Sequence, residues 1–454
     1  LPDVVLADDT LLLRTHLADM PLAPQARQAL SAAYARIERA KGIPLGTLDR
    51  FAREPLPRVM APVETVASII EALLPLPVEA PAGEGLAQRL QRVTPVSEDA
   101  ALQALEQMRT HGLSDTQVGE RIDGWHRNLV DLTRRLNGWM CIRQSQGAGW
   151  LVSSRTRRVA ALRIIECWQQ GLVGWSGIAD RTLNLDGLQL GDLPELSLPL
   201  PHVDTLDLTG VRLSAQGSNA FLGAFTHLRS LTLSGQNLQV LPRAIESMAT
   251  LERLALSGNE LLDPQEIYSV LGPLEHLQYL GLSHNDLPAF SVGTLPRLVE
   301  LDLRNNRITE WPEGTLQSVY LRELNLSGNR IAHIPEEAFD GQHDTLMQGT
   351  DLSDNSLSGD SLMRLWDYAL SVHPNAWLGY APDDLDLMLD ESGSGSDEEM
   401  TVESDVEEGG MPPQPDEVIT QIDARPEDLQ PWLETLEPKV ADSLVYPCLA
   451  PFPD

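Results

Sequence analysis

The stretch LERLALSGNEL, residues 251–261, decides the fold of this chain. Its middle part alternates apolar and other residues around Leu254 and Leu256, which is the period of a short β-strand with one buried face. Asn259 follows three residues after the second of these leucines, where the chain must turn. The stretch therefore predicts a short strand that buries leucine and ends in a tight turn.

Seven further stretches follow the same template, L-x-x-L-x-L-x-x-N-x-L, with few departures. They read DRTLNLDGLQL, VDTLDLTGVRL, LRSLTLSGQNL, LQYLGLSHNDL, LVELDLRNNRI, LRELNLSGNRI and MQGTDLSDNSL. The third apolar position advances by 21 to 26 residues from one copy to the next, which is the period of the leucine-rich repeat. We therefore predict an α/β solenoid, a leucine-rich-repeat horseshoe of about eight repeats over residues 180–357.

The template assigns a physical role to each of its positions. One strand per repeat stacks into a parallel sheet, with the leucines pointing into the core and the residues between them pointing outward. The asparagine of the turn can satisfy backbone groups that no strand reaches; it occurs as Asn259, Asn285, Asn306, Asn329 and Asn355. The first three copies carry Leu188, Val211 and Gln236 at this position, as expected for atypical terminal repeats.

The sequence before the repeats has the periodicity of helices. Residues 1–153 predict a helical region, and residues 154–179 predict a helical cap on the first repeat. Ser97 is the predicted N-cap of one helix, and Ser114 with Gln117 forms the capping-box pattern of the next.

The sequence after the repeats changes in composition. Residues 358–382 predict a short helix that caps the last repeat. Residues 383–414 are predicted to be a disordered acidic linker, because twelve Asp or Glu and no Lys or Arg occur between residues 383 and 408. A binding role for this acidic segment is the alternative. Residues 415–454 are predicted to form a short tail that is partly helical.

The charge of the chain limits its partners. The formal net charge is -33 and the sequence pI is near 4.5. Nucleic acid and anionic membranes attract basic surfaces, so we expect neither as a partner. A protein with a basic surface fits better. No window approaches the length of uncharged apolar residues that a membrane span needs, and the first residues lack the pattern of a cleavable signal.

The chemistry-bearing residues are few. Cys141, Cys167 and Cys448 are the only cysteines, and none has the spacing of a metal site or of a disulfide framework. Cys448 lies between Pro447 and Leu449 with no basic neighbour to activate it. We expect no catalytic residue, no metal site and no cofactor.

The segment HVDTLDLTG through SMATLERLALSGNEL, together with the preceding RVTPVSEDAALQALEQMRTHGLSDTQVGERIDGWHRNLVDLTRRLNGWM and RRVAALRIIECWQQ, resembles a known family. It is similar to the NEL-type effectors, the novel E3 ubiquitin ligases of Pseudomonas-like bacteria, over about residues 90–372. The resemblance implies a toxin-like helical region, then repeats that recognise a target, then a ligase domain. That domain carries a Cys-x-Asp motif, which none of the three cysteines matches.

Three functional hypotheses follow. The first is the target-recognition module of a secreted bacterial effector or toxin, which binds a protein on the concave face, a host protein being the candidate. The second is part of an E3 ubiquitin transferase whose catalytic domain follows or has diverged, with a ubiquitin-conjugating enzyme as a further partner. The third is a bacterial structural scaffold with no host target. The resemblance implies secretion by a non-classical route into the host cytoplasm; bacterial cytoplasm is the alternative.

The binding residues of the first hypothesis are the outward side chains of the strands and their ends. The core does not need them, so they are free to fit a partner. They include Asp204 and Asp207 in the early repeats. The predicted protein-binding set is Arg229, Glu252, Arg253, Gln278, Tyr279, His284, Glu300, Asp302, Arg304, Arg322 and Glu323. Tyr279 is predicted to lie between Arg253 and Arg304 on adjacent strands.

Overall fold

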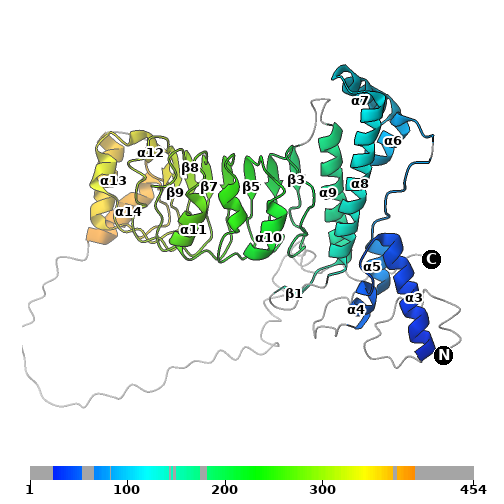
Figure 1. The fold of residues 1–454 in the computed structure, drawn as a ribbon. Helices are drawn as coiled ribbons and strands as arrows, with labels where there is room; N and C mark the ends of the chain where they lie inside the picture. The colour runs from blue at the N-terminus through cyan, green and yellow to red at the C-terminus, as the bar shows by residue number, and fades with distance from the viewer. Residues whose placement is uncertain are drawn as a thin grey trace, which may run out of the picture. The chain divides into compact units, whose positions relative to one another are not determined.

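The computed structural model describes residues 24–53, 66–81, 83–142, 145–146, 150–173, 181–371 and 376–393 (Figure 1). The predicted short tail at 415–454 and most of the predicted acidic linker lie outside these residues.

Within the described residues, six helices lie between residues 24 and 140. They are α3 (Pro24–Lys41), α4 (Thr47–Arg53), α5 (Val66–Ala72), α6 (Leu86–Val93), α7 (Glu98–Thr110) and α8 (Asp115–Met140). The predicted caps of α7 and α8 are confirmed. The Ser97 side chain accepts a hydrogen bond from the Ala100 amide, and the Ser114 and Gln117 side chains form both bonds of a capping box.

The region predicted as helical also contains a short hairpin. Strand β1 (Ser145–Gln146) pairs antiparallel with β2 (Trp150–Leu151). The predicted helical region is therefore confirmed, and it contains this hairpin in addition. Two-residue strands are too short to leave an alternating pattern in the sequence.

Helix α9 (Ser154–Val173) contacts the first strand of the repeats. The Arg163 guanidinium donates a 3.0 Å hydrogen bond to the Asn184 carbonyl. The His202 ring lies over α9 so closely that a Cβ added at Gly171 would overlap it. Hydrogen bonding and close packing thus hold α9 against the open edge of the sheet, which would otherwise expose unpaired backbone groups.

The repeats form one parallel sheet of eight strands in the order β10-β9-β8-β7-β6-β5-β4-β3. The strands are β3 (Thr182–Asn184), β4 (Thr205–Asp207), β5 (Ser230–Thr232), β6 (Arg253–Ala255), β7 (Tyr279–Gly281), β8 (Glu300–Asp302), β9 (Glu323–Asn325) and β10 (Thr350–Asp351). Figure 1 shows them following one another in chain order. The predicted solenoid of about eight repeats is confirmed.

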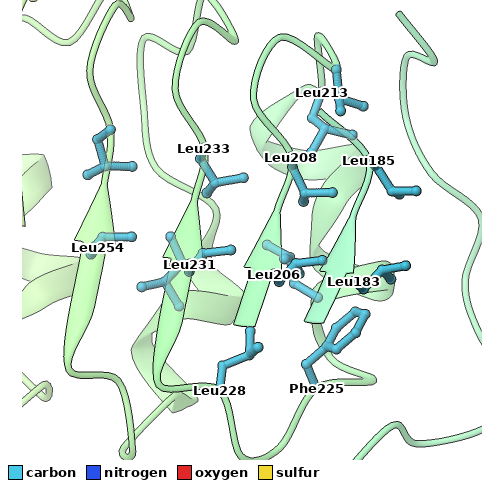
Figure 2. Close-up of a cluster of buried hydrophobic side chains, with 14 of the residues drawn as sticks. Leu183, Leu185, Leu206, Leu208, Leu213, Phe225, Leu228, Leu231, Leu233 and Leu254 are labelled. Carbon is cyan, nitrogen blue, oxygen red and sulfur yellow. The ribbon is translucent and has the colours of Figure 1, made fainter. Parts of the chain in front are cut away.

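The leucines of the template form the core. Leu183, Leu206, Leu231 and Leu254 pair in register on four successive strands, and each is at most 1% exposed. Figure 2 shows these side chains in one row, with Leu185, Leu208 and Leu233 in the next. Burying one such leucine stabilises the fold by about 1.5–3 kcal/mol.

Short helical segments connect the strands. They are α10 (Ala215–Leu222), η2 (Arg243–Ser247), α11 (Pro264–Leu271), η3 (Glu336–Phe339) and α12 (Asp344–Gln348). Their apolar residues, such as Phe221, Ile245 and Ile267, are buried in the same cluster as the strand leucines. The connections therefore pack on the leucine side of the sheet, and the other side of the strands stays open.

The predicted asparagine ladder is confirmed. Asn306 shows the pattern: its amide donates to the carbonyls of Leu282 and Leu303 at 3.0 and 2.9 Å, and its side-chain oxygen accepts from the Leu287 amide at 3.1 Å. In the earlier repeat, Gln236 replaces asparagine and makes the equivalent bonds to Leu208 and Leu213. The longer amide thus satisfies the same buried backbone groups.

Helix α13 (Gly359–Ser371) closes the other end of the solenoid. The Tyr368 hydroxyl donates a 2.6 Å hydrogen bond to Asp344, and its ring packs on Phe339. Residues 376–381 return toward the last strand, where the Tyr380 hydroxyl donates to the Leu352 carbonyl at 2.8 Å.

The acidic segment begins with a helix, so the prediction of disorder is wrong for residues 383–393. Helix α14 (Pro382–Gly393) contacts α13, with Leu385 fully buried and Met388 and Leu389 packed against the core. These three residues have the spacing of one helix face. Asp383 and Asp384 lie in the first turn, where the helix dipole favours negative charge.

Candidate protein-binding face

The outward side chains of β3 to β10 form an open surface, which we call the strand face. In most strands the middle leucine is buried and the two flanking residues are partly or fully exposed. Because the parallel ladder fixes the spacing of the strands, it also fixes the spacing of these side chains. The strand face is thus a preformed array of polar and charged groups.

The centre of the strand face is built from three strands. Arg253, Tyr279 and Glu300 are register partners on β6, β7 and β8. The Arg253 guanidinium carbon lies 4.1 Å from the centroid of the Tyr279 ring, and its Nη1 lies 3.9 Å from a carboxylate oxygen of Glu300. A guanidinium over a ring at this distance makes a cation–π contact. The predicted neighbours Arg253 and Tyr279 therefore touch.

The electrostatics of this centre are dominated by burial and carboxylates. Partial burial raises the pKa of Tyr279, and Asp302 and Glu300 raise it further. Burial also raises the pKa of Glu300, and the neighbouring Glu323 raises it further. At neutral pH the Tyr279 phenol keeps its proton and can donate a hydrogen bond to a partner.

Gly281 is a site residue that the sequence reasoning missed. A Cβ added at this position would lie 2.8 Å from the Tyr279 hydroxyl oxygen. The Tyr279 ring therefore lies along its own strand over Gly281. The sequence does carry a signal for this packing: a glycine occupies an outward strand position two residues after an aromatic residue.

A depression with a volume of about 570 Å³ lies beside Tyr279, over β8, β9 and β10. Five of the residues that line it belong to the predicted protein-binding set: Tyr279, Glu300, Asp302, Arg304 and Glu323. Further lining residues that the sequence reasoning missed are Asn325, Gln348 and Asp351. Asn325 and Asp351 occupy outward strand positions of the template, so the rule that outward strand side chains are candidate binding residues could have found them.

Arg304 is held by a carboxylate of its own repeat. Its Nε lies 3.4 Å from Asp302, and its backbone amide donates to the same carboxylate at 3.2 Å. Burial and the neighbouring carboxylates raise the pKa of Tyr279, and the positive charge of Arg304 offsets a part of that increase.

The other predicted residues do not join this centre. Arg229 and Glu252 form their own 2.9 Å ion pair. Arg322 turns back to donate to the carbonyls of Val319 and Leu321. Gln278 is exposed just before β7.

Three further predicted residues also have local partners. His284 lies in the turn after β7 with a positive φ of 54° and contacts Asn305. Among the earlier residues, Asp204 pairs with Arg181 at 3.3 Å, and Asp207 accepts bonds from Thr209.

The cysteines of the described residues are structural. Cys141 and Cys167 are both buried, while Cys448 lies outside the described residues. The Cys167 sulfur is 3.9 Å from Nε2 of His202, a pair that could suggest a nucleophile and a base. That same Nε2 lies 2.9 Å from the Cys167 carbonyl, which can only accept, so Nε2 carries a proton and cannot take one from the thiol.

The described part of the chain offers neither a metal centre nor a membrane-spanning helix. There, no three His, Cys, Asp or Glu side chains gather as a metal-binding group. Among the same residues, no helix has the length and apolar character of a membrane span.

Comparison with known families agrees with the fold. The family model described as leucine rich repeat matches residues 201–261 and 296–345. The Leucine-rich repeat-containing G-protein coupled receptor 5 of Rattus norvegicus is 39% identical over 145 residues, which are 30% of this chain and 15% of the receptor. Tsukushi of Gallus gallus is 33% identical over 166 residues, which are 35% of this chain and 44% of that protein.

The chain is also similar to the solved structure of a leucine-rich-repeat protein of Leptospira interrogans, with 25% sequence identity and a TM-score of 0.30. The match covers 37% of this chain and 53% of the Leptospira chain. This chain spans less than half of the length of the two relatives named above. The comparisons support the repeats and give no support to the effector resemblance. The family match and the eight-stranded parallel sheet together show that the chain contains a leucine-rich-repeat solenoid.

Proposed function

We propose that this chain is a protein-recognition module that binds its partner on the strand face. The observation that carries the proposal is the central group Arg253, Tyr279 and Glu300, which lies partly exposed on the open side of the sheet, is preorganised and is unnecessary for the leucine core. Tyrosine and arginine are the residue types enriched among interface hot spots.

The size of the strand face supports the proposal. Eight strands about 4.8 Å apart span roughly 34 Å, which is enough for a standard protein interface. The backbone ladder holds the side chains in place, so binding orders few additional groups.

A solvated charged face is the alternative explanation, since strand faces of soluble repeat proteins are polar in any case. The packing of Tyr279 argues against it. A large aromatic ring lies on the open side of the sheet, with Gly281 leaving room beneath it. Solubility alone does not require an aromatic ring at this position.

The test compares alanine variants with matched controls. Tyr279→Ala and Arg304→Ala are each expected to reduce strongly the capture of the protein that the wild-type chain retains from a lysate. Tyr320 is exposed in the loop before β9, and Arg330 is exposed after the Asn329 turn. Tyr320→Ala and Arg330→Ala remove the same side-chain types away from the strand face and should leave capture unchanged. Equal capture by all four variants would contradict the proposal.

The finer proposal is that this module selects the target of a secreted bacterial effector. The resemblance of about residues 90–372 to the NEL-type effectors supports it, and delivery into a host cytoplasm is part of the same proposal. Ligase chemistry is assigned to no residue of this chain. Mixed with a ubiquitin-charged conjugating enzyme, the chain is expected to form no thiol-sensitive ubiquitin adduct. An adduct that disappears in Cys448→Ala would favour the transferase alternative instead.

A further inference from the structure

We propose that the depression over β8, β9 and β10 receives an arginine side chain of the protein partner. This inference rests on the proposed function, because it takes the strand face as the binding face. It adds the chemistry of the partner at one place on that face.

The first argument is the charge of the depression. Its lining contains four carboxylates, those of Glu300, Asp302, Glu323 and Asp351, and one guanidinium, that of Arg304. Arg304 is exposed after the end of β8 and lies beside Asp302 at 3.4 Å, so its charge offsets Asp302 and its remaining N–H groups stay available to a different group of the partner, an acceptor. The lining therefore keeps an excess of negative charge.

The second argument is the placement of two like charges. Glu300 and Glu323 are register partners on adjacent strands, and like charges directly opposite each other destabilise a sheet. Among the described residues, Glu323 has no ion pair, and Glu300 reaches only Arg253, at 3.9 Å. The neighbouring Glu323 also helps to raise the pKa of Glu300, after burial. A cation placed between the two carboxylates would relieve this repulsion.

The third argument is that the chain already shows how a guanidinium packs here. Arg253 stacks on the Tyr279 ring and approaches Glu300 from the β6 side. Tyr279 also forms the wall of the depression on the β7 side. A partner arginine entering the depression would meet the same ring and the same carboxylate, with Glu323 in addition.

Arginine fits this place better than lysine. Its planar guanidinium stacks on aromatic rings and donates paired hydrogen bonds to carboxylates, whereas the lysine ammonium is a more strongly hydrated point charge. The wider region would attract such a partner, because residues 182–393 contain 30 Asp and Glu against 10 Arg and no Lys.

The test uses the full chain and a short blocked peptide of Gly and Ser with one central Arg. Binding is followed through the backbone amide resonances of β8, β9 and β10. The arginine peptide is expected to shift these resonances with a saturable dependence on concentration. Peptides with central Lys or with citrulline, the neutral isostere of arginine, should bind more weakly. Equal binding of the citrulline peptide would overturn the proposal, and so would equal binding of the lysine peptide.

The variants remove one charge at a time without changing shape. Glu300→Gln and Glu323→Gln should each raise the Kd of the arginine peptide about fivefold to tenfold, as expected for a lost charge-assisted hydrogen bond. Glu252→Gln is the matched control, since Glu252 lies on the same face but pairs with Arg229. Its Kd should stay within about twofold. An equal loss in all three variants would mean general attraction to an acidic protein and would overturn the proposal.

A second readout needs no ligand. If Glu300 and Glu323 repel each other, Glu323→Gln should raise the Tm of the unbound chain, whereas a lowered Tm would contradict the argument. Concentration-dependent dimers that disappear in Glu323→Gln would instead identify a second copy of this chain as the occupant.

Failure of the arginine site and failure of the strand face as the binding face give different results. A partner that is lost with Tyr279→Ala but retained by both glutamine variants would refute the arginine site and leave the strand face as the binding face. A partner unaffected by Tyr279→Ala would refute both.

Discussion

The Arg253 guanidinium lies 4.1 Å from the centroid of the Tyr279 ring on the neighbouring strand. A cation–π contact at an exposed site contributes about 0.5–1 kcal/mol. Its larger effect is to hold both side chains in one arrangement before a partner arrives, so less conformational entropy is lost on binding. The contact thus fixes the position of the Tyr279 ring, on which partner binding is expected to depend.

Gly281→Ala should separate binding from stability. The new Cβ would lie 2.8 Å from the Tyr279 hydroxyl oxygen, so the ring must move away. Because this oxygen is the end of a flexible side chain, we expect the free energy of unfolding to change by less than about 1 kcal/mol. Partner binding should fall nonetheless, by calorimetry or surface plasmon resonance. Unchanged binding would mean that the position of the Tyr279 ring is unimportant.

Gly349→Ala should destabilise the last repeat. A Cβ at this position would overlap the carbonyl oxygen of Arg322, which is backbone and cannot rotate away. We expect a loss of about 2–3 kcal/mol in urea unfolding, as for overpacked sites. Gly138→Ala in α8 is the control, because its Cβ would meet no atom within 4 Å. It should be neutral or slightly stabilising.

Asn306→Ala should remove a rung of the buried ladder. The substitution leaves the carbonyls of Leu282 and Leu303 and the amide of Leu287 without their partner. Because unsatisfied buried groups are costly, we expect a loss of about 2–4 kcal/mol. The neighbouring Asn305 is exposed with a positive φ of 54°, so Asn305→Gly should change the stability by far less. Equal losses in both variants would contradict the role given to the ladder.

Acid should loosen the contact between α9 and the first repeat. Burial lowers the pKa of His202 below its usual 6.5, so the unfolded chain takes up a proton at higher pH than the folded one. Stability is therefore lost as pH falls through about 6.5 toward the folded pKa. The free energy of unfolding of the wild type should fall between about pH 7.5 and 5.5. His202→Gln cannot titrate and should show a smaller decrease; an identical decrease would assign the effect to other groups.

The repeats were predictable because each copy repeats one physical constraint. Leucines such as Leu254 must alternate along a strand to be buried on one face, and Asn259 must hydrogen-bond the backbone groups of the turn. Eight copies of this pattern therefore determine the sheet. Helix α14 was not predicted, because the many acidic residues concealed the helical spacing of Leu385, Met388 and Leu389.

The arrangement of the predicted binding residues could be predicted only in part from the sequence. The template shows which side chains point outward, but not which of them touch. The contact of Arg253 with Tyr279 follows from the strand register and from side-chain rotamers. The separate pairing of Arg229 with Glu252 has the same origin.

The most direct test of the account is the Kd of the captured partner for four forms of the chain: wild type, Tyr279→Ala, Arg304→Ala and the control Arg330→Ala. We predict that Tyr279→Ala and Arg304→Ala each weaken binding by about 2 kcal/mol, roughly thirtyfold in Kd, with Tm unchanged. Arg330→Ala should bind like the wild type. If both strand-face variants bind like the wild type while changes in the helical region abolish binding, the repeats are a scaffold and the recognition surface lies elsewhere.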